Sequence, residues 1–165
     1  MTNTKYSAWA KENRSFKTDL EAGKNGENTI YKYLKNLPDT KDVDDISNTP
    51  RGIEDDIDFE VMSETETYTV ELKTDLKAGR TGNLPFEKYS HGNPGCLWRT
   101  KADYVIFYLP DKNQVLWIDI KAWQEYTAQK SESCMINMGE GARGFLDRIS
   151  TLKSKGIILF EDKAA

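Results

Sequence analysis

Residues 56–76, DIDFEVMSETETYTVELKTDL, contain two runs in which apolar and polar side chains alternate. Alternation with a period of two is typical of β-strands that bury one face. The polar stretch SETE, residues 63–66, separates the runs and is predicted to be a turn, so the segment is expected to form an antiparallel hairpin with one buried face. The side chains expected on that face are Ile57, Phe59 and Val61 from the first strand, and Tyr68, Val70 and Leu72 from the second.

The polar face of this hairpin gathers opposite charges. Glu71 and Lys73 share it on the second strand, and Asp58 lies on the first, within cross-strand reach of both. Two carboxylates on one face form a hard-oxygen site suited to Mg²⁺ or Mn²⁺. A neighbouring lysine can polarise a water or stabilise negative charge on a phosphate, so the group has the minimum equipment for phosphodiester hydrolysis. The alternative is an exposed Glu71–Lys73 ion pair, which would stabilise the fold by only ~0–1 kcal/mol.

Length and composition indicate one soluble globular domain spanning residues 1–165. The sequence has no apolar run near the ~20 residues of a membrane helix and no N-terminal signal core. We therefore expect a cytoplasmic protein without a membrane partner. Cys96 and Cys134 are the only cysteines and form no CxxC motif, which favours a reduced setting. With His91 as the single histidine, zinc is not expected.

The charge is unevenly distributed along the chain. The net charge of −4 argues mildly against a general nucleic-acid binder. Residues 39–66 are strongly acidic, whereas residues 73–101 are on balance basic. An acidic segment next to a basic one fits a site that binds a divalent metal and a polyanion together. A mixed, solvated surface explains the same pattern equally well.

The segments before the hairpin are predicted to be mainly helix and loop. Residues 1–15 are expected to form a short helix or an N-terminal arm. Apolar spacing predicts a helix over residues 16–35, weakened by Gly23 and Gly26 and firm only from about Asn25. Residues 37–52 carry two prolines and many Asp, Asn and Thr residues, which predicts a loop.

The segments after the hairpin add strands and two helices. Residues 77–83 and 91–101 are predicted to be irregular, with a third strand over 84–90 between them. The apolar run 102–109 is expected to be a strand buried on both faces, paired through a turn with residues 114–120. Asp119 is expected to cap a helix that extends to Lys130. The remaining predictions are a glycine-rich connector over 137–144, a helix over 145–156 and a strand over 156–160, which together indicate an α/β or α+β fold.

The motifs GENTIYKYL (26–34), DFEV (58–61) and VELK (70–73) together resemble the core of the PD-(D/E)XK nuclease superfamily. This superfamily includes restriction endonucleases, Holliday-junction resolvases and related phage and repair nucleases. Its members place an Asp on one strand and an acid-x-Lys on the next, and a preceding helix often supplies a glutamate. The resemblance covers roughly residues 23–108. Ile57 stands where the family name has proline, a position that members commonly vary.

The resemblance implies a restriction-endonuclease-like fold, in which helices flank a central mixed sheet, and Mg²⁺-dependent cleavage of nucleic acid, usually DNA, with Mn²⁺ able to substitute. It implies that Asp58 and Glu71 bind the metal, with the Leu72 carbonyl as a third ligand. Lys73 would orient the attacking water. Glu27 would assist from the helix, through a metal-bound water or a second ion.

Two choices within this assignment concern single residues. Asp56 shares a face with Asp58, but Asp58 sits deeper in the apolar strand and closer to Glu71, which favours Asp58. The stretch TGNLPFEKYS, residues 81–90, is similar to a Gly-Asn and strand glutamate that follow the acid-x-Lys strand in several members. Glu87 is therefore an accessory candidate, although a charge at a sheet edge explains it equally well.

The basic residues after the hairpin are the candidates for binding the DNA backbone. His91 is also explained as an ordinary solvated loop residue. The full set of nucleic-acid-binding candidates is Lys77, Arg80, Lys88, His91, Arg99 and Lys101.

These observations predict a Mg²⁺-dependent DNA endonuclease that is structure-selective, as resolvases are, or of low specificity. A homodimer is expected because two active sites can cut two strands. The stretch GEGARG lacks the GK[ST] ending of a phosphate loop, so no nucleotide cofactor is expected. The alternative is a nuclease-fold protein that binds DNA or another protein without cutting, and a third possibility is an RNA-directed nuclease.

Overall fold

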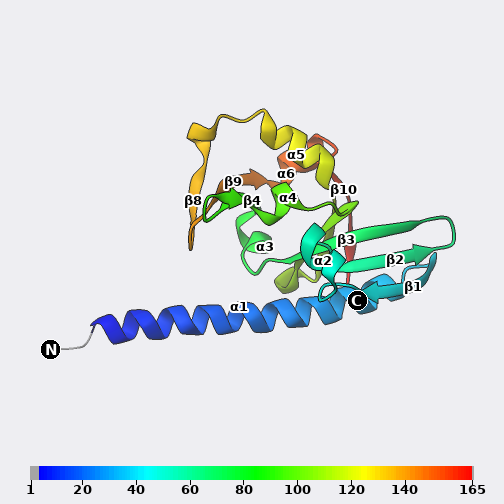
Figure 1. The fold of residues 1–165 in the computed structure, drawn as a ribbon, viewed down its shortest axis with the longest axis horizontal. Helices are drawn as coiled ribbons and strands as arrows, with labels where there is room; N and C mark the ends of the chain where they lie inside the picture. Colours follow the sequence, from blue (N-terminus) through cyan, green and yellow to red (C-terminus); the bar gives the residue numbers. More distant parts are fainter. Residues whose placement is uncertain (1–3, 165) are drawn as a thin grey trace.

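The computed structural model describes the backbone of residues 4–164 and the side chains of residues 18–164. It is a mixed α/β fold built on two sheets (Figure 1). The helices are α1 (Thr4–Lys35), α2 (Pro50–Asp55), α3 (Ala78–Thr81), α4 (Cys96–Arg99), α5 (Ile120–Ala128) and α6 (Ile149–Ser154), with 3₁₀ turns η1 (Pro110–Lys112) and η2 (Glu132–Cys134). Within the described residues, no helix has the length and apolar character needed to cross a membrane.

The central sheet is mixed and has six strands in the order β1-β2-β3-β6-β7-β10. Strands β3 and β6 are parallel, and each of the other neighbouring pairs is antiparallel. The strands of this sheet are β1 (Thr40–Asp45), β2 (Phe59–Ser63), β3 (Thr67–Thr74), β6 (Tyr104–Leu109), β7 (Gln114–Asp119) and β10 (Ile158–Lys163). The second sheet is antiparallel, in the order β5 (Asn93–Pro94), β4 (Asn83–Ser90), β9 (Ala142–Arg148) and β8 (Ile136–Gly139). The predicted strand over 84–90 therefore belongs to the second sheet.

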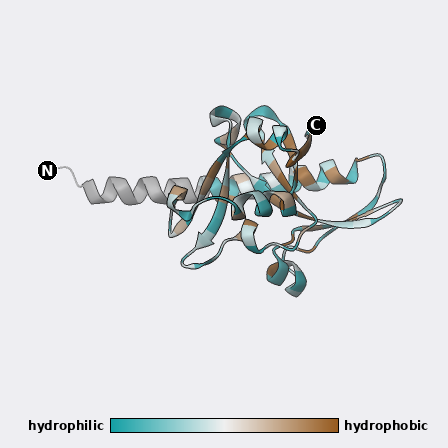
Figure 2. Cartoon of the chain, turned by 90° about the horizontal axis from the view of Figure 1, so that it is seen from above, coloured by the Kyte–Doolittle hydropathy of each residue, from teal (hydrophilic) through white to brown (hydrophobic). Residues whose placement is uncertain are grey.

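Two apolar clusters cover the two faces of the central sheet. One lies against α1 and includes Ile30, Leu34, Val70 and Leu72. The part of α1 that lies along the body carries both hydrophobic and hydrophilic residues (Figure 2). The other cluster joins the sheet to β4, α5 and α6. Its largest side chains are Phe86, Phe107 and Trp123.

Strand β6 contributes to both clusters. Ile106 packs toward α1, and Val105 and Phe107 pack toward the second sheet. This confirms the prediction that the run 102–109 is buried on both faces. The paired strand β7 and the Asp119 cap of α5 are confirmed as well, since the Asp119 carboxylate accepts from the Ala122 N–H at 3.0 Å.

Helix α1 is continuous through both of its central glycines, so the prediction that it is firm only from about Asn25 is wrong. A side chain at Gly26 would overlap the Thr74 hydroxyl at the end of β3, so this glycine lets helix and strand approach closely. Near the helix end, the Tyr33 hydroxyl donates to Asp162 at 2.8 Å and accepts from the Trp117 indole at 3.0 Å. These contacts fix α1 to the sheet. Residues 1–3 of the expected N-terminal arm lie outside the described residues.

Residues 37–52 are not simply a loop, because they contain β1 and the start of α2. Strand β1 is an edge strand in which only Val43 is buried, so it shows no apolar alternation. The start of α2 has a sequence signal, since Pro50 occupies the first turn and the Thr49 hydroxyl accepts from the Gly52 N–H. The stretches 77–83 and 91–101, predicted to be irregular, likewise contain α3 and α4.

The glycine-rich stretch 137–144, predicted to be a connector, holds the end of β8, a turn at Glu140 and Gly141, and the start of β9, and residues 145–148 continue β9 instead of starting a helix. The inward positions of this part of β9 are Phe145 and Asp147. Because Asp147 is polar yet only 4% exposed, the alternation does not show in the sequence. Its carboxylate accepts from the Trp123 indole at 2.7 Å and pairs with the Lys130 ammonium.

The β2–β3 hairpin forms as predicted, with Phe59 opposite Val70. The expectation of a single buried face is wrong for β3, whereas on β2 the other face stays open, with Glu60 half-buried and Met62 exposed. Thr69 and Glu71 are each only 6% exposed. Since Val70 and Leu72 pack toward α1, the alternation of the strand directs Glu71 and Lys73 to the side of the second sheet.

Candidate active site

Asp58 stands immediately before β2 and is fixed by both neighbouring strands. Its N–H donates to the Val70 carbonyl at 3.0 Å, and its carbonyl accepts from the Ile46 N–H at 2.8 Å. Its carboxylate accepts from the Leu72 N–H at 2.8 Å. The side chain therefore extends the β2–β3 ladder by one hydrogen bond and comes to lie beside Glu71.

Glu71 and Lys73 form the second half of the group. The Lys73 ammonium donates to Glu71 Oε1 at 2.8 Å, and the Cys96 thiol donates to the same oxygen at 3.1 Å. The Glu71 side chain is 7% exposed and that of Lys73 is 34% exposed. The carboxylate is thus held inside the protein, while the ammonium keeps access to solvent.

The electrostatics of the two carboxylates are coupled. Burial and, next, the negative charge of Glu71 together raise the pKa of Asp58 to about 7, against the lowering effects of the Leu72 N–H and Lys73. Burial lowers the pKa of Lys73, but the charge of Glu71 outweighs that effect and leaves it raised. Without a metal ion, Asp58 near neutral pH is therefore partly protonated beside a charged Glu71–Lys73 pair.

The donors available for a divalent cation are two carboxylates and one main-chain carbonyl. Within residues 18–164, no three His, Cys, Asp or Glu side chains converge closely enough to hold a metal ion. In an antiparallel ladder the N–H and C=O of one residue point to the same side. Since the Leu72 N–H is bonded to Asp58, the Leu72 carbonyl faces the same side, beyond the start of β2. Asp58, Glu71 and this carbonyl are hard-oxygen donors that fit Mg²⁺, which usually keeps several waters.

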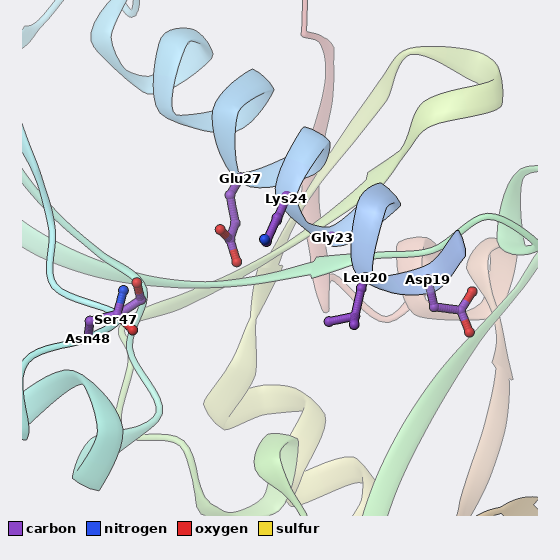
Figure 3. Close-up of a pocket in the computed structure, with 7 residues that line it drawn as sticks. All are labelled: Asp19, Leu20, Gly23, Lys24, Glu27, Ser47 and Asn48. Atoms are coloured by element: carbon purple, nitrogen blue, oxygen red, sulfur yellow. The ribbon is translucent and has the colours of Figure 1, made fainter. Parts of the chain in front are cut away.

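Glu27 is not part of this group in the structure. It is exposed on α1, which packs against the opposite face of the central sheet from Glu71 and Lys73. Figure 3 shows it at a cavity that it shares with Ser47 and Asn48, in the loop after β1.

Glu87 lies near Lys73 although it belongs to the second sheet. A cavity of about 310 Å³ between the sheets is lined by Lys73, Glu87 and Cys96, among others. The predicted accessory position therefore faces the same hollow as the candidate water-orienting lysine.

Two of the candidate DNA-binding cations, in and just after α4, are held in ion pairs. Arg99 makes two bonds to Asp56, at 2.5 and 2.9 Å, and Lys101 pairs with Asp55 at 2.9 Å. Of the two aspartates considered for the site, Asp58 thus lies beside Glu71, whereas Asp56 is bonded to Arg99. A cation held in an ion pair of this kind is less available to bind a phosphate than an unpaired cation is.

The remaining candidate cations fall into two groups. Lys88 is 7% exposed, with its ammonium 4.8 Å from the Trp98 ring centroid and 3.5 Å from a Glu132 oxygen. His91 is exposed in the turn after β4. Lys77 and Arg80 are exposed just after β3. Lys77 and Arg80 are therefore the accessible cations closest in sequence to Lys73.

Cys96 is the contributor that sequence analysis did not identify. It begins α4, and burial raises the pKa of its thiol to about 12, so it remains a hydrogen-bond donor to Glu71 at neutral pH. Nothing in the sequence near Cys96 indicates this role, because the contact depends on how α4 packs over β3.

Comparison of the chain with family models, curated proteins and solved structures finds no match. The interpretation of the site therefore depends on its geometry and chemistry.

The raised pKa of Asp58 gives a prediction for the metal-free protein. Since the folded-state pKa of about 7 lies above the unfolded value, the folded state binds the extra proton, and stability should fall as pH rises from about 4 to about 7. Asp58→Asn removes this titration but keeps an oxygen for the Leu72 N–H. We expect the variant to be more stable than the wild type at pH 8 by on the order of 2 kcal/mol, and to show little difference at pH 4.

Thermal melting in EDTA across this pH range measures the effect. Mg²⁺ at pH 8 should raise the melting temperature of the wild type and leave that of Asp58→Asn unchanged. If the melting temperatures of the wild type and of Asp58→Asn changed with pH in the same way, Asp58 would not titrate as described.

Proposed function

We propose that this protein is a Mg²⁺-dependent endonuclease that hydrolyses DNA phosphodiester bonds. The observation that carries the proposal is the packing of Asp58 against Glu71 across neighbouring strands, with Lys73 on the same side as Glu71. A pair of carboxylates of which one is buried and the other half-buried is costly unless a proton or a cation compensates both. Lys73 compensates Glu71, and a divalent cation between the two side chains would compensate Asp58 as well.

The residues of the group have separable roles in the proposed reaction. Asp58, Glu71 and the Leu72 carbonyl would hold the cation, and binding would displace the proton from Asp58. A bound divalent ion would lower the pKa of a coordinated water and offset charge on the phosphate. The Lys73 ammonium, partly open to solvent, can donate to the attacking water or to a phosphate oxygen. Its bond to Glu71 fixes its position.

The proposal extends to a restriction-endonuclease-like core. Three features support this part of the proposal. Strands β2 and β3 form an antiparallel hairpin, and β6 lies parallel beside β3. Helix α1, which precedes these strands in the sequence, packs on the sheet. We further propose that the enzyme acts in the cytoplasm as a homodimer, so that two active sites cut two strands.

The experiment that tests the function is a substrate panel. The purified protein is titrated with Mg²⁺ and Mn²⁺ on supercoiled, linear duplex, single-stranded and four-way-junction DNA, with an RNA arm. Glu71→Gln serves as the matched inactive variant. We expect cleavage of at least one DNA substrate by the wild type and none by the variant. Equal residual cleavage by both proteins would identify a contaminating nuclease and overturn the assignment.

A nuclease-fold protein that binds DNA or a protein without cutting is the second candidate. The Glu71–Lys73 ion pair favours it, because Lys73 and Cys96 already satisfy Glu71 Oε1. In the same panel, binding of DNA without cleavage in either metal would select this candidate. Cleavage confined to the RNA arm would instead identify a ribonuclease.

A further inference from the structure

Helix α4 and the two residues after it, here called the α4 segment (residues 96–101), contact both halves of the candidate active site. At the first residue of the helix, the Cys96 thiol donates to Glu71 on β3 at 3.1 Å. At its last residue, Arg99 donates to both carboxylate oxygens of Asp56, which stands two positions before Asp58. One short helix therefore joins the β3 half of the site to the chain that leads into the β2 half.

Asp56 has a backbone conformation that few residues adopt. It ends α2 in the left-handed region, with φ of 51° and ψ of 64°, where residues other than glycine are uncommon. Such conformations persist where surrounding contacts hold them, and they gather at functional sites. Besides the two bonds from Arg99, the Thr100 hydroxyl donates to the Asp56 carbonyl at 2.7 Å. The next residue, Lys101, donates its N–H to the Asp55 carbonyl at 2.9 Å. The α4 segment thus holds this turn in place.

The connector from Asp56 to β2 is short and has little freedom. Only Ile57 stands between Asp56 and Asp58, and it is buried, with its N–H donating to the Gly52 carbonyl in α2 at 2.9 Å. The backbone of Asp58 is therefore fixed on one side by its bond to Val70 and on the other by the turn at Asp56. Since groups at a catalytic site must be held within about 0.5 Å of their productive places, a shift of this turn would disturb the Asp58 carboxylate.

Helix α4 is itself anchored in the core. Leu97 is buried in the cluster that includes Phe86 and Trp123. The Gln124 side chain in α5 donates to the Leu97 carbonyl at 3.0 Å. The Trp98 ring packs edge-on against Phe86, with ring centroids 6.1 Å apart. The helix can therefore act as a fixed support to which both halves of the candidate site are attached.

We propose that Arg99 is a positioning residue, which holds Asp56 and thereby sets the place of the Asp58 carboxylate for the divalent cation. The same helix holds Glu71 through Cys96, so that α4 sets the separation of the two carboxylates. A guanidinium paired with a carboxylate through two bonds fixes geometry as well as charge. The inference rests on the proposed nuclease function, because it takes Asp58 as a ligand of the metal in that reaction. It assigns Arg99 to the metal site and not to the DNA backbone.

Arg99→Gln tests the proposal on the protein without DNA. The dissociation constant for Mn²⁺, measured by electron paramagnetic resonance, should rise about tenfold, as is typical when a residue that supports metal ligands is lost. Loss of a nearby positive charge would by itself lower this constant, so the expected change has the opposite sign to a simple charge effect. The melting temperature in EDTA should fall by no more than about 4 °C, because the Arg99 side chain is 52% exposed.

Cleavage and DNA binding give two further measurements on Arg99→Gln. The Mg²⁺ concentration for half-maximal cleavage should rise by the same factor as the Mn²⁺ constant, and the rate at saturating Mg²⁺ should return close to that of the wild type. The affinity for labelled DNA in EDTA should equal that of the wild type. A residue that binds the DNA backbone would give the reverse pattern, with weaker DNA binding and an unchanged need for metal.

Two further variants show whether the effect comes from the contact with Asp56. Asp56→Asn breaks the same ion pair and keeps a residue that tolerates the left-handed backbone. The double variant with Arg99→Gln should bind Mn²⁺ no more weakly than the weaker single variant, since one contact is lost in all three. Additive losses would overturn the proposal. The matched control is Arg51→Gln, which breaks an ion pair of similar exposure with Glu60 and should not raise the dissociation constant.

The outcomes separate this inference from the proposed function. If Arg99→Gln has the wild-type Mn²⁺ constant and the wild-type Mg²⁺ requirement, the positioning role is overturned and the nuclease stands. If Arg99→Gln weakens Mn²⁺ binding but the wild type cleaves no nucleic acid, the positioning role stands and the nuclease is overturned. A wild type that neither binds Mn²⁺ nor cleaves overturns both.

Discussion

Replacing Lys73 with alanine is expected to lower the rate of DNA cleavage by about 10³-fold or more, since a positioned proton donor or charge contributes ~10²–10⁴. The change removes the donor to the attacking water and also the bond that holds Glu71 Oε1 in place. Binding of DNA should remain detectable, because the other exposed candidate cations, Lys77 and Arg80 among them, are unaffected. Single-turnover cleavage at saturating Mg²⁺ measures the rate, and fluorescence anisotropy measures binding.

The matched control is Lys121→Ala, which removes an exposed lysine at the start of α5. It should cleave at the wild-type rate. Lys73→Arg keeps the charge but changes the geometry of the donors, so it should recover only part of the activity. Full activity in Lys73→Ala would remove Lys73 from the chemistry and leave the Glu71–Lys73 contact as a structural ion pair.

The largest effect on stability is expected from Lys130→Met. Among the described residues, this change leaves the carboxylate of Asp147, 4% exposed, with only the Trp123 indole as a partner. Breaking a buried ion pair from one side costs about 3–5 kcal/mol, which corresponds to a fall in melting temperature of roughly 10 °C for a chain of this length. The methionine keeps most of the apolar stem that packs near Tyr126 and Phe145.

Adding Asp147→Asn to Lys130→Met should restore most of the lost stability, because the amide oxygen can still accept from the Trp123 indole without carrying a charge. The comparison variant is Lys153→Met, which breaks the more exposed pair with Glu161 and should change stability by about 1 kcal/mol or less. If Lys130→Met and Lys153→Met melt at the same temperature, the buried pair does not stabilise the fold as argued.

The central part of the fold could be predicted because its strands follow local rules. The hairpin alternates visibly, and the apolar run of β6 marks it as a strand buried on both faces. Strand β1 could not be recognised, since a single inward residue, Val43, gives no period. In β9 the inward Asp147 interrupts the apolar pattern, and its partners, Trp123 in α5 and Lys130 just after it, are distant in the sequence. Local patterns fail where a long-range contact makes a polar residue acceptable in the core.

Part of the candidate site could likewise be predicted from the sequence, and part could not. The alternation of side chains along a strand predicts that Glu71 and Lys73 share a face, and the hairpin turn brings Asp58 close to them. The thiol of Cys96 could not be predicted, because it depends on the docking of α4. The pairing of Arg99 with Asp56 depends on the same contact between distant segments. Spacing in the sequence indicates which residues share an element, but it does not show which elements meet.

The hydroxyl of Tyr33 has a consequence for the order of folding. It is bonded to Trp117 and to Asp162, and the second of these bonds spans 129 positions of the chain. Contacts of high sequence separation form late, because long segments must first be brought together. During synthesis, α1 is made before the strands that it packs on, but this anchor cannot form until β10 has been made. The apolar residues of the helix that carries Gly23 and Glu27 can therefore pack on the nearby strands before its Tyr33 hydroxyl finds its partner.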